Sequence, residues 1–178
     1  SEADAAAFTD SLSTAPAETE RLQADLDAES PAPPTIESLG ITDGTTLDEL
    51  NVRLSQVLAE QSAVESRFTD LEAQIQIQGS RPADARRRIS ELRTSRNELN
   101  TVLQATPPPG EPQALTDARM LRTELRRIAQ AAEINRLEQE LVSHSIRLEL
   151  LKAQLSVAAR ERLQLQRRAD FLRAQVNE

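Results

Sequence analysis

Residues 47–78 read LDELNVRLSQVLAEQSAVESRFTDLEAQIQIQ, and this stretch decides the fold. Apolar side chains recur in it at alternating steps of three and four residues, with charged side chains such as Arg53 and Glu60 between them. The ten positions of this stripe are Leu47, Leu50, Leu54, Val57, Gln61, Val64, Phe68, Leu71, Ile75 and Gln78. Because eight of the ten are apolar, the pattern predicts a helix that buries one narrow face against another helix, as in a coiled coil.

The composition favours the same architecture for the whole chain. Its 178 residues include three Phe but no Trp, Tyr or Cys, and the apolar content is mainly Leu and Ala. Without aromatic anchors a thick globular core is difficult to fill, whereas paired helices need only aliphatic side chains. We therefore predict an all-α fold in which long antiparallel coiled-coil helices form an elongated helical bundle.

Capping residues and the helix breakers Gly and Pro predict where the helices begin and end. Thr46 and Glu49 have the spacing of a capping box, and Gly79 with Pro82 indicates a break and a tight reversal. The predicted helices cover about 46–78, 82–104 and 114–178, with a Pro-rich connection at 107–112 between the last two. The sequence leaves open whether the third helix is continuous or is bent or broken near 129–145, since the stripe changes phase before Leu137.

The first 45 residues differ from the rest of the chain. They hold ten acidic side chains against one basic side chain, together with Pro and Gly, whereas residues 46–178 hold 19 acidic and 20 basic side chains. This acidic, Pro-rich segment is expected to be mostly flexible, with a short helix over about 17–29. The near balance of charge in residues 46–178 argues against nucleic acid as a partner.

The stripe continues through the later helices and is interrupted by polar residues. In the second and third predicted helices it includes Ile89, Leu92, Leu99, Leu137, Leu141, Leu148, Leu151 and Leu155. Gln61, Arg96, His144 and Arg162 occupy positions in the same stripes, where an unpaired buried polar group would cost about 1–3 kcal/mol. We expect these four residues to pair across the helices and set their register.

No catalytic, cofactor or metal site is predicted. The only histidine, His144, has one acidic residue at helical spacing, Glu140, and four glycines do not suffice for a phosphate-binding loop. Nothing in a rod creates the pocket that an enzyme or a small-molecule substrate requires. The expected role is therefore non-catalytic, with no cofactor.

Several segments together resemble a known family. They are the opening 46–50, the Arg81-Pro82 turn with the basic residues that follow it, the Pro-rich break, residues 114–118 with Leu125, residues 147–153 and the ending 171–177. In this order they are similar to the periplasmic N-terminal coiled-coil domain, the so-called MscS porin domain, of large MscK-type mechanosensitive channels of Gram-negative bacteria. The resemblance covers residues 46–178 and leaves out the first 45.

The resemblance implies a role and a location. The chain would be a periplasmic domain of an inner-membrane ion channel that protects cells from osmotic downshock, with a structural or gating-regulatory function. Its partners would be the other subunits of a homo-oligomeric channel and components of the cell envelope. The alternative interpretation is a coiled-coil adaptor or scaffold of an envelope efflux or secretion complex.

Overall fold

The computed structural model describes residues 2–28, 32–42 and 44–177, with the backbone alone at residue 2. Within these ranges the chain forms three α-helices, α1 (Glu2–Asp27), α2 (Leu47–Gln104) and α3 (Gln113–Asn177). All regular structure in the described part is helical, so the predicted all-α class is confirmed. The helix ends predicted at residues 29 and 178 lie outside the described residues.

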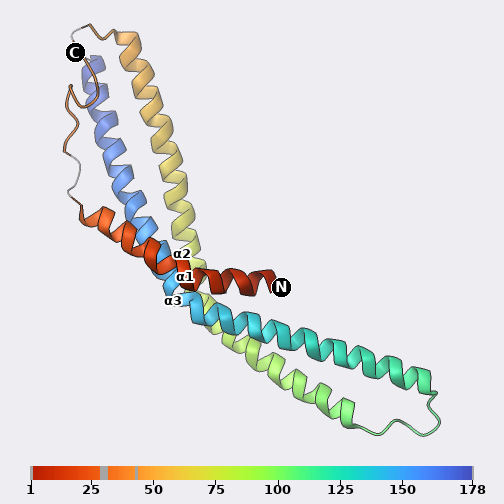
Figure 1. The fold of residues 1–178 in the computed structure, drawn as a ribbon. Coiled ribbons are helices and arrows are strands. Elements are labelled where there is room, and N and C mark those ends of the chain that lie inside the picture. Colours follow the sequence, from red (N-terminus) through yellow and green to blue (C-terminus); the bar gives the residue numbers. More distant parts are fainter. Residues whose placement is uncertain (1, 29–31, 43, 178) are drawn as a thin grey trace. The chain divides into compact units, whose positions relative to one another are not determined.

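Helices α2 and α3 lie side by side and run in opposite directions (Figure 1). Gln61, early in α2, bonds to Gln166, late in α3, whereas Arg93, late in α2, bonds to Glu138, early in α3. The chain divides into two compact units, each built from stretches that are separate in sequence. Both units contain part of each helix.

Unit 1 comprises residues 1–15 and 77–147. Its core is an apolar cluster contributed by α2 and α3. The cluster consists of Ala85, Ile89, Leu92, Ile134 and Leu137, with Leu141 packed against it. On α2 these positions are separated by four and three residues, which places them on one face of a helix.

Unit 2 comprises residues 16–76 and 148–178, and all three helices contribute to its buried side chains. The apolar ones are Leu22 of α1, Leu50 and Leu71 of α2, and Ala153, Ala158, Leu165, Ala169 and Leu172 of α3. The alanines on α3 let neighbouring helices approach closely because their side chains are small. Helix α1 is also held near its C-terminus, where Arg160 Nη1 donates a hydrogen bond to the Leu26 carbonyl at 3.4 Å.

The predicted start of α2 is confirmed. Glu49 Oε2 accepts a hydrogen bond from the Thr46 amide at 2.9 Å, and the Glu49 amide donates to Thr46 Oγ1 at 3.3 Å. These two bonds satisfy amides that have no partner within the helix. Leu47, the first helical residue, is 57% exposed, so its assignment to the buried stripe is wrong. The buried face begins about one turn later, at Leu50.

The predicted break at 79–82 is also wrong. Helix α2 runs without interruption from Leu47 to Gln104 and contains Pro82. The stripe explains this result, because Gln78, Pro82, Ala85 and Ile89 keep the alternating spacing of four and three residues. Continuous burial of one face outweighs the modest helix penalty of Gly79 and the single backbone bond that a proline removes.

The interpretation of residues 1–45 needs a larger correction. Residues 2–27 form one helix, α1, instead of a mostly flexible segment with a short helix at 17–29. Ala15, Thr19 and Leu22 are buried along α1, again at steps of four and three. Packing of this face stabilises a helix whose sequence alone, with Pro16 inside it, indicates an interruption.

At the other end of the chain, α3 is a single helix from Gln113 to Asn177, which decides against a break near 129–145.

Candidate functional site

Pro82 creates the need for an unusual contact in unit 1. A proline has no amide hydrogen, so the carbonyl of Gln78, four residues earlier, lacks its normal helical donor. His144 of α3 supplies a replacement, because its Nε2 lies 2.8 Å from the Gln78 carbonyl oxygen. A carbonyl oxygen only accepts, so Nε2 carries the hydrogen and donates it. The only histidine of the chain thereby satisfies the backbone group that the proline leaves open.

One turn before His144, a buried carboxylate forms the centre of a charged cluster. Glu140 is 4% exposed, and its two oxygens accept hydrogen bonds from Nε and Nη2 of Arg81 at 2.8 and 2.9 Å. Arg136 Nη1 approaches the same carboxylate at 3.5 Å. The hydrogen bond to Glu140 raises the pKa of Arg81 above its ordinary value, with burial acting in the opposite direction.

Arg147 completes the cluster, which we call the Pro82 cluster and define as Gln78, Arg81, Pro82, Arg136, Glu140, His144 and Arg147. Its Nη2 donates to the Glu140 backbone carbonyl at 3.4 Å and its Nε to Ser143 Oγ at 3.2 Å. The guanidinium carbon lies 4.6 Å from the centre of the Phe8 ring, a cation–π distance that links α1 to α3. Burial lowers the pKa of Arg147, while Glu140 raises it and Arg81 lowers it further.

The contacts of the Pro82 cluster connect neighbouring helices. One buried carboxylate faces three arginines, so each charge depends on the others for its compensation. The bonds join α2 to α3 at the proline, and the Phe8 contact adds α1. In the described ranges no group of three or more His, Asp or Glu side chains is arranged to hold a metal ion.

The apolar residues predicted for the stripes lie mainly on inward faces within each unit. Five are buried, namely Leu50, Leu71, Ile89, Leu92 and Leu137. Ten are half-buried, namely Leu54, Val57, Val64, Phe68, Ile75, Leu99, Leu141, Leu148, Leu151 and Leu155. Leu47 is exposed, as described above.

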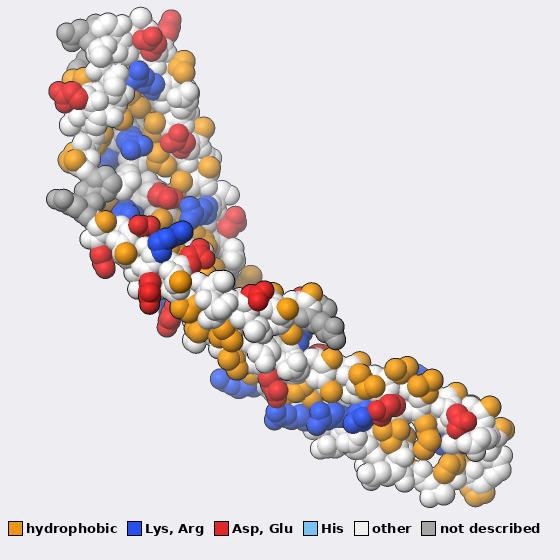
Figure 2. Space-filling view, viewed as in Figure 1, with side chains coloured by type: hydrophobic (Ala, Val, Ile, Leu, Met, Phe, Trp, Pro, Cys, Tyr) orange, Lys and Arg blue, Asp and Glu red, His pale blue; other side chains and the backbone are white. Residues whose placement is uncertain are grey.

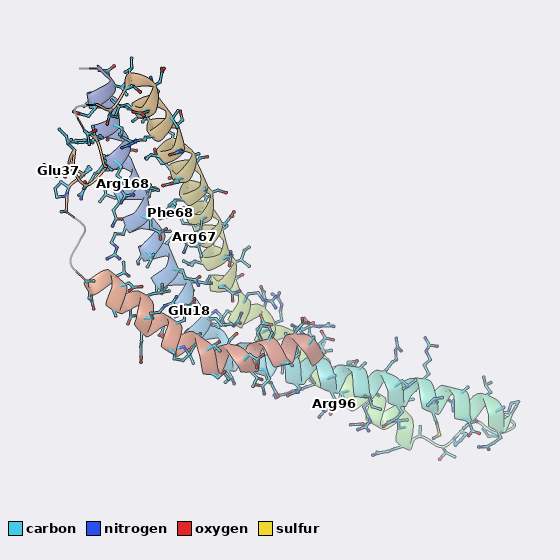
Figure 3. The ribbon with its side chains drawn as sticks, turned by 45° about the horizontal axis from the view of Figure 1, so that its top comes forward. Glu18, Glu37, Arg67, Phe68, Arg96 and Arg168 are labelled. Atoms are coloured by element: carbon cyan, nitrogen blue, oxygen red, sulfur yellow. The ribbon has the colours of Figure 1, made fainter. Side chains whose placement is uncertain are left out.

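Two of the four polar residues predicted to set the register make contacts across unit 2. Gln61 Nε2 donates to Gln166 Oε1 at 2.6 Å. Arg162 of α3 lies over the Phe68 ring at 4.3 Å and forms an ion pair with Glu65 at 3.4 Å. Figure 3 labels Phe68 on α2. In unit 1, His144 bonds to α2 as described, and Arg96 is half-buried.

The sequence does not predict the Pro82 cluster as a site, although Gln78 and His144 are both recognised as stripe positions. From the sequence, Arg81 is expected in a turn, and Glu140 stands out only as the acid nearest to His144 along its own helix. A usable signal was present, because Pro82 falls at a stripe position and the stripe keeps its phase on both sides. A proline inside a continuous helix leaves the carbonyl four residues earlier without its helical donor, and a histidine on a neighbouring helix is well suited to supply one.

Comparison with known protein families gives a match over the whole chain. Residues 1–178 match the family model described as the mechanosensitive ion channel porin domain. The match includes the first 45 residues, so the expectation that they lie outside the resemblance is wrong. No curated protein and no solved structure matches the chain. Within the described residues, none of the helices has an apolar stretch that would cross a bilayer. The chain belongs to the mechanosensitive ion channel porin domain family.

Proposed function

We propose that the chain is a non-catalytic periplasmic extension of a large MscS/MscK-type channel, with a structural or gating-regulatory role during osmotic downshock. The observation that carries the proposal is the family match over residues 1–178. In this proposal the partners are the other subunits of a homo-oligomeric channel and components of the cell envelope.

The architecture supports a structural contribution. Helices α2 and α3 each pass through both compact units as single helices. Ion pairs across α2 and α3 join Arg67 to Glu161 in unit 2 and Arg88 to Glu133 in unit 1. Within each unit these ion pairs tie α2 to α3, and paired helices that are tied in this way support a structural contribution to a channel.

The role is tested in the full-length channel encoded by the same gene. Residues 1–178 are deleted, and the channel is expressed in a bacterial strain that lacks other tension-gated channels. We expect the deletion to change the tension threshold in patch-clamp recordings, or survival after downshock, while the pore still opens. An unchanged threshold and unchanged survival, at equal channel abundance, would refute the role.

The location is tested separately with a cysteine probe. The chain has no native cysteine, so Ser62→Cys in the full-length protein creates a single reactive thiol within this domain at an exposed position. A charged thiol reagent that crosses the outer membrane but not the inner membrane should label this residue in intact cells. Labelling only after cell lysis would place the domain on the cytoplasmic side and contradict the proposal.

A further inference from the structure

Helix α3 exposes an apolar stripe in unit 1, near the turn that joins it to α2. The stripe consists of Ala118, Leu121, Leu125, Ile128 and Ala132, which alternate by three and four residues. Its three large side chains are 62%, 57% and 54% exposed, in the order Leu121, Leu125 and Ile128. Figure 2 shows hydrophobic side chains along this part of α3, which Figure 1 draws in blue-green. We call this surface the 118–132 stripe.

The face of α3 that is buried in the same region is largely polar. Thr123 Oγ1 donates to the Arg119 carbonyl of its own helix at 2.8 Å, and Thr116 Oγ1 donates to the Glu111 carboxylate at 2.7 Å. Gln130 Nε2 donates to Ser95 of α2 at 2.9 Å. Hydrogen-bonded side chains therefore face inward while the 118–132 stripe faces solvent. No described residue of this chain covers the exposed leucines and isoleucine, although they have the spacing of a coiled-coil seam.

Charges beside the stripe identify the partner that fits it. In heptad notation Ala118, Leu125 and Ala132 occupy a positions, and Leu121 and Ile128 occupy d positions. Asp117 then occupies a g position and Arg122 the next e position, and both are exposed. In a parallel coiled coil the g residue of one helix faces the following e residue of its neighbour, which here brings acid to base on both edges. An antiparallel pair would bring g edges together and e edges together, so it forms no such acid–base contact.

We propose that the 118–132 stripe is a contact surface between copies of this chain, which pair in parallel through it. Parallel copies are also what identical subunits anchored in one membrane present to each other. The inference deepens the proposed function by assigning a surface at which neighbouring subunits meet, and to that extent it rests on the proposed function. The pairing itself is a property of the chain in solution and is measured there.

The first test compares two leucine substitutions in the 178-residue chain. Leu125→Glu places a charge in the stripe, whereas the control Leu163→Glu makes the same change at a 51% exposed leucine elsewhere on α3. Sedimentation equilibrium over a dilution series should show self-association of the wild type and of the control. Leu125→Glu should weaken association about a hundredfold or more. Each copy loses a leucine that becomes buried in the dimer, and it gains a charge that the dimer would desolvate. Equal helicity by circular dichroism shows that the variants remain folded.

The second test measures the direction of pairing. Ala118→Cys and Ala132→Cys are made as separate single-cysteine variants, since the chain has no native cysteine. In parallel copies in register, each cysteine faces its own equivalent at a distance that a disulfide can bridge, so each variant alone should form a covalent dimer on mild oxidation. Failure of both variants to form a dimer, while the wild type self-associates, would show that the copies do not pair in parallel and in register, and would overturn the proposal.

Two further results would also overturn it. One is a wild-type chain that stays monomeric and uncrosslinked at every concentration tested. The other is a monomeric chain that binds anionic phospholipid vesicles through the stripe, shown by loss of vesicle binding in Leu125→Glu, since the stripe would then be a membrane surface. Neither result alters the threshold and survival measurements of the deletion, so failure of the pairing and failure of the channel role are distinguishable.

Discussion

The Pro82 cluster gives a sharp prediction for Glu140→Gln. The substitution keeps the size of the side chain but removes its charge. One of the two carboxylate oxygens that accept hydrogen bonds from Arg81 becomes an NH₂ group, which donates. Breaking a buried ion pair costs about 3–5 kcal/mol, and a hydrogen bond to a charged group contributes about 1.5–3 kcal/mol. Because the Arg81 side chain is 38% exposed and can turn toward water, we expect a loss of about 2–3 kcal/mol in the free energy of unfolding.

The matched control is Glu138→Gln, two residues earlier on α3. Glu138 also binds an arginine of α2, Arg93, at 2.7 Å, but the two side chains are 43% and 61% exposed. This control removes the same charge from the same helix and should cost less than about 0.5 kcal/mol. Urea unfolding followed by circular dichroism measures both variants. Equal small shifts in the midpoint would refute the reasoning that burial makes the Glu140 pair important for stability.

Three further predictions follow from individual contacts. His144→Phe should lower the free energy of unfolding by about 1–2 kcal/mol in the wild type. The loss should be clearly smaller in a Pro82→Ala background, because residue 82 then has an amide that can donate to the Gln78 carbonyl. A double-mutant cycle by urea unfolding measures the difference. The hydrogen bond from Arg127 lowers the pKa of Glu124, so the stabilisation linked to that carboxylate is present above its unfolded-state pKa and is lost as the pH falls through the folded-state value. Arg127→Gln should raise the pKa of Glu124 toward its ordinary value in an NMR titration. Leu172→Ala, at a position 1% exposed, should destabilise the chain by about 2–5 kcal/mol in the same unfolding assay.

Much of the fold follows from spacing in the sequence. Alternating steps of three and four residues place side chains on one face of a helix, so positions such as Leu50, Leu71 and Ile89 could be recognised as inward-facing without a structure. The errors at Pro82 and Pro16 have one cause. At each proline a local signal for a helix break competes with burial along a stripe that continues past it, and burial prevails.

The candidate site was harder to predict. Arg81 and Glu140 are 59 residues apart, and their meeting depends on how α2 and α3 align. A heptad pattern matches itself after each repeat, so several alignments bury similar apolar faces and each offers Arg81 a different acidic partner. Only the His144 contact carries a specific clue, because the orphaned carbonyl of Gln78 occurs once on α2.

The division of the chain into two units also affects the order in which it becomes structured during synthesis. In unit 1 the paired parts of α2 and α3 lie within the continuous stretch 77–147, to which residues 1–15 are added, whereas unit 2 pairs residues 16–76 with residues 148–178. Gln61 and Gln166 are 105 residues apart, which at about 5–20 residues per second means a wait of roughly 5–20 seconds for the ribosome to deliver the partner. During that interval the apolar face from Leu50 to Ile75 is open to aggregation. The charged residues beside it and the polar Gln61 within it then protect the nascent chain, in addition to what they do in the finished fold.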